Sequence, residues 1–197
     1  KLTMKRKLML IAAVLLLGLT NVKAQDVFNK GAIAVNANIG LSNYSYGYGL
    51  LNSSVGLPPI SASFDVGVID GLIADRASVG VGGYAGLSTY SYKYYDYYKE
   101  SMTRMCFGVR GTFHFQLTEK LDTYAGLMLG LYTYSYKYSY NPDYDYYSGY
   151  NTRNNSSDLA FSSFIGARWY ISKNFGFNAE LGYGFTYISA GLTFRLK

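Results

Sequence analysis

The chain has 197 residues and a formal net charge of +6, but that positive charge is concentrated at its start. Residues 1–24 contain five basic and no acidic residues, which leaves 13 basic against 12 acidic residues, or +1, on the remaining 173. The near-neutral remainder argues against a nucleic-acid partner. One cysteine, Cys106, excludes an intramolecular disulfide. One cysteine with one histidine is too few ligands for a closed zinc site, so no metal is expected.

The first 24 residues have the order of a secretory signal peptide. Lys5-Arg6-Lys7 precede an apolar run at residues 8–19, and Val22-Lys23-Ala24 form a cleavage site before Gln25. A membrane anchor is the alternative, but the apolar run is shorter than the roughly 20 residues that a spanning helix needs. We therefore expect a signal peptide at residues 1–24 and one domain at residues 25–197.

After residue 32 the sequence repeatedly alternates apolar with polar or small residues, a period of two that predicts β-strands. In the first run, Ile33, Val35 and Ala37 alternate with Asn36 and Asn38. Eight such runs occur, at residues 33–41, 60–69, 79–88, 104–115, 124–131, 161–170, 177–184 and 188–196.

The charges of these runs lie on one face. They are Asp65, Arg104, Arg110, Arg168, Glu180 and Arg195, and all share the glycine-rich polar face. A water-exposed face would carry charges of both signs, and the apolar face has none, so it should contact lipid. Because strands in lipid must satisfy their own backbone hydrogen bonds, the runs should close on themselves. The predicted fold is all-β, an eight-stranded antiparallel up-and-down transmembrane β-barrel.

The connections between the runs alternate in character. Those at residues 42–59, 93–101 and 137–157 are long or rich in tyrosine, whereas residues 70–77, 116–122 and 172–175 are short. Residues 184–187 predict a tight turn on the long-loop side. In outer-membrane barrels the short turns lie in the periplasm and the long loops outside the cell.

Four motifs carry a resemblance over residues 31–197: GVRGTFHF at 108–115, YAGLMLG at 124–130, IGARWY at 165–170 and AELGYG at 179–184. The chain resembles the small outer-membrane β-barrel family of the OmpX and OmpA-transmembrane-domain type, in the form common in Bacteroidetes-like bacteria. The resemblance implies a monomer in the bacterial outer membrane, in contact with membrane lipid, lipopolysaccharide and the outer-membrane assembly machinery. Such barrels usually end in an aromatic residue, whereas this chain ends Phe194-Arg195-Leu196-Lys197, which shifts the expected assembly signal to Phe194 and Leu196.

The six inward charges are expected to form an ion-paired network, because eight strands leave an interior just wide enough for side chains. Glu180 should be shared among arginines, since an unpaired charge in so narrow a space is costly. The excess of arginine over carboxylate leaves an alternative, a small gated channel with a weak preference for anions.

His114 is the only histidine, and it shares the polar face with Thr112 and Arg110. An outer-membrane lipid-modifying enzyme would need a base within reach of a hydroxyl nucleophile. His114 lies near the periplasmic end, away from outer-leaflet lipid, and no serine nucleophile motif accompanies it. We therefore expect no catalytic residue, no cofactor and no enzymatic activity, with the lipid-modifying enzyme as a remote alternative.

The hexapeptide TYSYKY occurs twice, at residues 89–94 and 133–138, and 18 of the 23 tyrosines lie in residues 44–48, 90–98 and 132–150. Two tyrosine-rich hairpin arms are expected at the extracellular end. Their candidate binding residues share one face: Tyr90, Tyr92, Tyr94, Tyr134, Tyr136 and Tyr138. Tyrosine with serine and glycine is the composition of antibody recognition loops. The leading hypothesis is surface interaction or adhesion, with a host protein, a glycan or lipopolysaccharide as partner, or a role in envelope integrity. An aromatic belt at the membrane interface is the alternative.

Overall fold

The computed structural model describes residues 27–41, 56–73, 75–94, 98–140 and 152–196. The predicted signal peptide, most of the 42–59 connection and residues 141–151 lie outside the described residues. The strands are β1 (Ile33–Leu41), β2 (Ile60–Leu72), β3 (Ala77–Tyr94), β4 (Tyr98–Thr118), β5 (Leu121–Tyr140), β6 (Thr152–Tyr170), β7 (Phe175–Tyr183) and β8 (Ile188–Arg195). Each predicted run overlaps one of them. Within the described residues no helix is long and apolar enough to cross a membrane.

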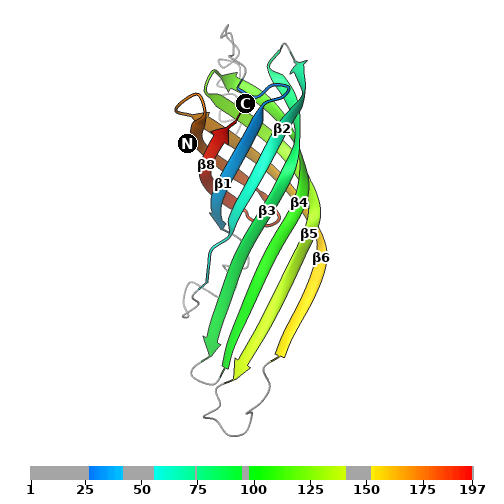
Figure 1. Cartoon of the computed structure of the whole chain (residues 1–197), viewed down its shortest axis with the longest axis vertical. Helices are drawn as coiled ribbons and strands as arrows, with labels where there is room; N and C mark the ends of the chain where they lie inside the picture. The colour runs from blue at the N-terminus through cyan, green and yellow to red at the C-terminus, as the bar shows by residue number, and fades with distance from the viewer. Residues whose placement is uncertain (1–26, 42–55, 74, 95–97, 141–151, 197) are drawn as a thin grey trace, which may run out of the picture.

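The eight strands close into a ring in sequence order, and every neighbouring pair is antiparallel. The ring is closed by β1 and β8, which pair from Ala34 with Arg195 to Leu41 with Ile188. Closure leaves no free edge within the ring. The predicted up-and-down barrel topology is confirmed. Figure 1 shows β1 and β8, the first and last strands, side by side.

The predicted alternation of faces is also confirmed. Along β4, buried Arg104, Arg110 and His114 alternate with Phe107 and Val109, which are 53% and 70% exposed. On β4 the outward apolar positions run from Phe115 to Met105. Ten residues at about 3.4 Å each, tilted by about 40°, span roughly 26 Å along the barrel axis. The outward surface is therefore an apolar belt of the height that a transmembrane barrel requires, as predicted for this fold class.

Four strands are much longer than the sequence runs that predicted them. β3 to β6 have 18 to 21 residues, whereas β1 and β7 have nine and β8 has eight. The expected connections at residues 93–101 and 137–157 were wrong in extent, because residues 93–94, 98–101, 137–140 and 152–157 are paired strand. Tyrosine, threonine and serine in alternation continue a strand as readily as aliphatic residues do.

We call the projecting part of β3 to β6 the extended sheet; it comprises residues 88–94, 98–104, 132–140 and 152–158. It is one sheet rather than the two separate arms expected, because β4 also pairs with β5 up to Tyr98 and Tyr140. β6 pairs with β7 only from Ser163 onward. Among the described residues, residues 152–162 of β6 therefore pair with β5 alone. Figure 1 shows the extended sheet at the end opposite the labelled N and C termini.

Candidate functional site

The lumen near the termini holds a network of buried charges, which we call the charged layer: Asp65, Arg110, His114, Asp122, Arg168 and Glu180. Arg110 Nη2 donates to Glu180 Oε1 at 2.8 Å, and its Nε lies 3.1 Å from Asp65 Oδ1. Arg168 pairs with Asp65 on one side and with Asp122 Oδ2 at 3.0 Å on the other. The structure thus brings together four of the six predicted network residues, from strands β2, β4, β6 and β7.

Tyr124 and Asn36 complete the contacts of this layer. The Tyr124 hydroxyl donates to Glu180 Oε1 at 2.8 Å, and Arg168 Nε donates to Asn36 Oδ1 at 3.1 Å. Arg168 and Asp65 have no exposed surface at all. Ions so far from water are tolerated only when paired and hydrogen-bonded, and these are.

Arg104 and Arg195 lie outside the charged layer, which corrects their predicted place in it. The guanidinium of Arg104 lies over the rings of Tyr132 and Phe185, with its Cζ 4.1 Å and 5.1 Å from the ring centroids. Arg195 Nη1 donates to the Val27 carbonyl oxygen at 3.2 Å at the termini end. β-Strand parity gives the direction of a side chain but not its height in the barrel, and these two are at opposite ends.

Asp122 and His114 belong to the charged layer although sequence reasoning did not include them. His114 Nδ1 lies 2.9 Å from Asp122 Oδ1, and its Nε2 lies 2.8 Å from Thr112 Oγ1. Asp122 was missed because residues 116–122 were interpreted as a turn, whereas β5 begins at Leu121. Continuing the alternation back from Tyr124 would have placed Asp122 in the lumen.

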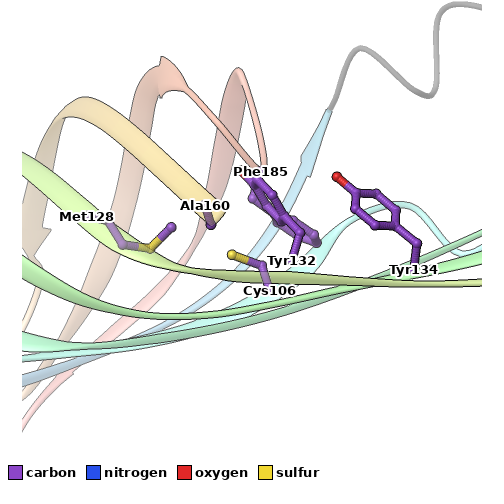
Figure 2. Close-up of a cluster of buried hydrophobic side chains, with 6 residues drawn as sticks. All are labelled: Cys106, Met128, Tyr132, Tyr134, Ala160 and Phe185. Atoms are coloured by element: carbon purple, nitrogen blue, oxygen red, sulfur yellow. The ribbon is translucent and has the colours of Figure 1, made fainter. Parts of the chain in front are cut away.

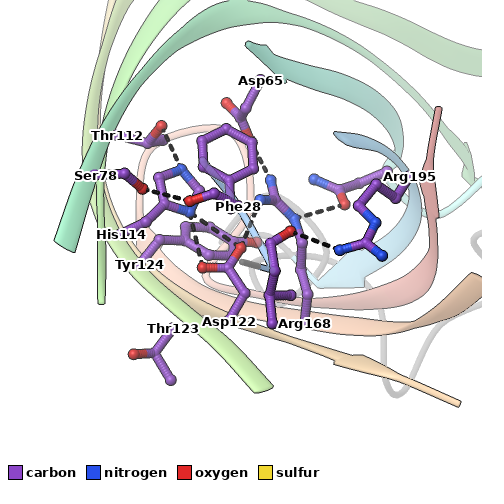
Figure 3. Close-up of polar contacts among 12 residues, drawn as sticks. Phe28, Asp65, Ser78, Thr112, His114, Asp122, Thr123, Tyr124, Arg168 and Arg195 are labelled. Carbon is purple, nitrogen blue, oxygen red and sulfur yellow. Dashed lines mark hydrogen bonds and ion pairs between the residues drawn. The ribbon is translucent and has the colours of Figure 1, made fainter. Parts of the chain in front are cut away.

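Thr112, His114 and Asp122 have the order of a hydroxyl, a base and an acid, but all three are buried in the lumen. The ring of Phe28 covers His114, with centroids 3.8 Å apart and planes at 17° (Figure 3). A nucleophile must reach its substrate, and this hydroxyl is buried in the lumen beside His114. The arrangement orients and packs His114.

Phe28 belongs to a segment that closes the barrel near the termini, residues 27–32, which we call the N-terminal plug. The Phe28 carbonyl oxygen accepts hydrogen bonds from Ser78 Oγ at 2.7 Å and Gln116 Nε2 at 3.1 Å. Gly31 and Ala32 exchange backbone hydrogen bonds with Gly67 of β2, both of 2.9 Å. Phe28 is completely buried, so the plug is an integral part of the packed lumen.

Further toward the extended sheet the lumen is filled by an aromatic layer: Cys106, Met128, Tyr132, Tyr134, Ala160 and Phe185. Figure 2 shows these side chains converging from β4, β5, β6 and the β7–β8 turn. Cys106 is a buried packing residue here. Between the charged and aromatic layers, a cavity of about 20 Å³ remains beside Arg110, Glu180 and Phe185. A space of that size holds about one water molecule.

The candidate tyrosines project from the inner face of the extended sheet. Tyr134 and Tyr136 stack with centroids 6.4 Å apart, and Tyr132 lies 6.1 Å from Tyr134. Tyr90, Tyr136 and Tyr138 are partly buried, and Tyr134 is buried. Tyr92 and Tyr94 lie in β3, but their side chains are outside those described. A membrane belt is contradicted for the described four, because they share the face of buried Arg104 and Cys106.

No group of three or more histidine, cysteine or acidic side chains in the described ranges is placed to hold a metal ion. The fold and the packed lumen together define the class, an eight-stranded transmembrane β-barrel with a filled interior.

No family model matches the chain, and no curated protein matches it in sequence. Solved structures to which it is similar include Ail of Yersinia pestis in complex with the heparin analogue sucrose octasulfate. That comparison has 13% identity over 84% of this chain and 95% of Ail, with a TM-score of 0.46. OprG of Pseudomonas aeruginosa gives 8% identity over 86% of this chain and 97% of OprG, with a TM-score of 0.45. The fold assignment rests on this chain's own strand pairing.

Proposed function

We propose that the protein is a non-enzymatic barrel of the bacterial outer membrane whose extended sheet recognises a partner at the cell surface. The observation that carries this proposal is the difference between the closed ring and the projecting sheet. Packed side chains fill the ring, whereas the extended sheet projects beyond it and offers accessible surface among the described residues. The apolar belt supports the membrane placement.

Membrane placement is tested by gel mobility. A closed barrel should migrate faster before boiling than after it, because detergent has no free strand edge at which to start unfolding the ring. Equal mobility with and without boiling would defeat the proposed placement.

The inner face of the extended sheet supports recognition. It combines half-buried Tyr90, Tyr136 and Tyr138 with acidic Glu100 and Asp158 from the neighbouring strands. Tyrosine supplies a large contact with little loss of side-chain entropy, and stacking onto Tyr134 orders it further. A glycan or a host protein segment is the partner class that such a surface suits.

The channel alternative lacks a supporting observation, since two packed layers and the N-terminal plug occupy the lumen. The enzyme alternative also lacks one, because the single histidine is buried under Phe28. Neither is proposed as a second function.

The recognition surface is tested with nanodisc-embedded protein on a glycan array and on a panel of immobilised host surface proteins. Replacing Tyr90, Tyr136 and Tyr138 by serine should reduce a bound signal at least tenfold, since buried tyrosines dominate binding energies. The matched control replaces Tyr183 and Tyr187, which lie on the outer face and at the β7–β8 turn, and should retain binding. A triple variant that binds like the unmodified protein would defeat the proposal.

A further inference from the structure

The outer face of the extended sheet carries the same order of residue types on each strand. Moving away from the apolar belt, β4 has Met105, Thr103, Ser101 and Lys99. The corresponding residues are Leu131, Thr133, Ser135 and Lys137 on β5, and Leu159, Ser157, Asn155 and Arg153 on β6. An apolar residue is followed by two small polar residues and then by a basic one. The TYSYKY repeat therefore encodes two faces, with tyrosine inside and threonine, serine and lysine outside.

The spacing sets the height of the basic residues above the belt. Each lies six residues beyond the last apolar position, about 20 Å along the strand and about 15 Å along the barrel axis. Phospholipid headgroups extend only roughly 5–7 Å beyond the hydrocarbon on each side. The basic side chains therefore lie above the phospholipid headgroups, at the height that the larger saccharide head group of a glycolipid would occupy.

The charges of this face are of one sign. Lys99, Lys137 and Arg153 are exposed, and no acidic side chain is among the described residues of the outer face of the extended sheet. Lys137 lies directly opposite Arg153, a cross-strand arrangement that destabilises a sheet when both charges are alike. An anion bound between them would remove that repulsion.

The small polar residues of this face supply further hydrogen-bond donors beside the basic residues. Arg153 Nε donates to Ser135 Oγ at 3.1 Å, which draws the guanidinium over β5 and toward the membrane. Hydroxyls of Ser101 and Thr103 line the adjoining strand, and Ser101 Oγ lies 2.9 Å from Ser91 Oγ of β3. Guanidinium, ammonium and hydroxyl donors together are the groups that bind phosphate oxygens.

We propose that Lys99, Lys137 and Arg153 bind phosphate groups on the saccharide head of an outer-leaflet glycolipid. The partner of the outer face is then the membrane's own lipid, whereas the inner face remains available to a partner from outside. This inference rests on the membrane placement proposed above and is independent of recognition by the tyrosines.

The test compares two probes on the folded full-length protein in phosphatidylcholine nanodiscs: lipopolysaccharide with a phosphorylated core, and the same material after its phosphates are removed. A basic residue near an anionic surface contributes about fivefold in affinity. Replacing Lys99, Lys137 and Arg153 by serine should therefore weaken binding of the phosphorylated probe on the order of 100-fold. The charge-matched control replaces exposed Lys30, Lys120 and Lys173 at the termini end and should bind like the unmodified protein.

Gel mobility before boiling reports insertion of each variant, so loss of the barrel is distinguished from loss of binding. If the triple variant does not insert, the double variant Lys137→Gln with Arg153→Gln should still lose about 25-fold. Unchanged affinity in an inserted variant would overturn the inference. An equal loss of affinity for the dephosphorylated probe would also overturn it.

Discussion

The inward face of the strands has two chemistries, one inside the closed ring and one beyond it. Inside the ring it carries Asp65, Arg110 and Arg168, whose charges are paired and removed from water. Beyond the ring the same face carries Tyr90, Tyr136 and Tyr138, which are only partly buried. Closure of the ring is what differs, because an enclosed face must satisfy every charge internally, whereas a face with one side open can present its groups to a partner.

The comparison indicates that stability and recognition are separated along the strands. A substitution in the charged or the aromatic layer should affect the free energy of unfolding, and one at the partly buried tyrosines of the extended sheet should affect binding.

Replacing Asp65 by asparagine should lower the free energy of unfolding by about 3–5 kcal/mol. Arg110 and Arg168 would both lose a buried anionic partner, and breaking a buried ion pair has costs of this size. Urea titration of the protein in lipid vesicles measures the change. Asp158→Asn in the exposed part of β6 is the control and should stay within about 0.5 kcal/mol. Equal urea midpoints for Asp65→Asn and the unmodified protein would indicate that water enters the lumen and solvates these charges.

Replacing Phe28 by alanine should lower the free energy of unfolding by about 3 kcal/mol, because a completely buried ring is removed from its stack on His114. The plug should also become accessible to protease added at the periplasmic side. Asn29→Ala, at a partly exposed neighbour, provides the comparison. A plug that is equally protected in both variants would contradict the packing described for Phe28.

Replacing Gly67 by alanine should destabilise the barrel by about 1–3 kcal/mol, as overpacking of a tight contact does. A methyl group at this position would overlap the Asn29 carbonyl, so the plug has to move. Gly111→Ala is the matched control, since open space surrounds that position on the outer surface. The difference between the two urea midpoints measures the contribution of plug docking, and no difference would argue that the plug does not dock on β2.

Replacing Tyr136 and Tyr138 by serine should change the free energy of unfolding by less than about 1 kcal/mol, because both side chains lie beyond the ring and are only partly buried. Tyr132→Ser, in the buried aromatic layer under Arg104, should cost more than both together. The reverse order in urea titrations would contradict the separation of stability from recognition.

Alternation predicted the strands and which side chains share a face. The ring and the inward position of the six charges followed from the absence of charge on the apolar face and from the need of strands in lipid to satisfy their backbone hydrogen bonds. Alternation did not give the strand ends. The repeats at residues 89–94 and 133–138 were expected as the arms of two hairpins, but connections were predicted at residues 93–101 and 137–157, where β4 already begins at Tyr98 and β5 continues to Tyr140. Because the strands were cut short, Lys99, Lys137 and Arg153 on the outer face were overlooked.

The lumen contacts were harder to predict because they depend on height and on distant segments. Asp122 required the strand to begin three residues earlier than the predicted run at residue 124. Phe28 lies before the first strand, where no alternation marks it, and only the fold brings it to His114. The register between strands, which no single strand specifies, decides that Asp65 lies between Arg110 and Arg168.

Single-channel recording in planar bilayers tests the central claim, that the lumen is closed and function lies in the extended sheet. The unmodified protein should show no discrete conductance above the bare bilayer, and neither should Phe28→Ala, because the charged and aromatic layers still fill the lumen. Reproducible openings of the unmodified protein, selective for anions, would contradict the account and favour a channel.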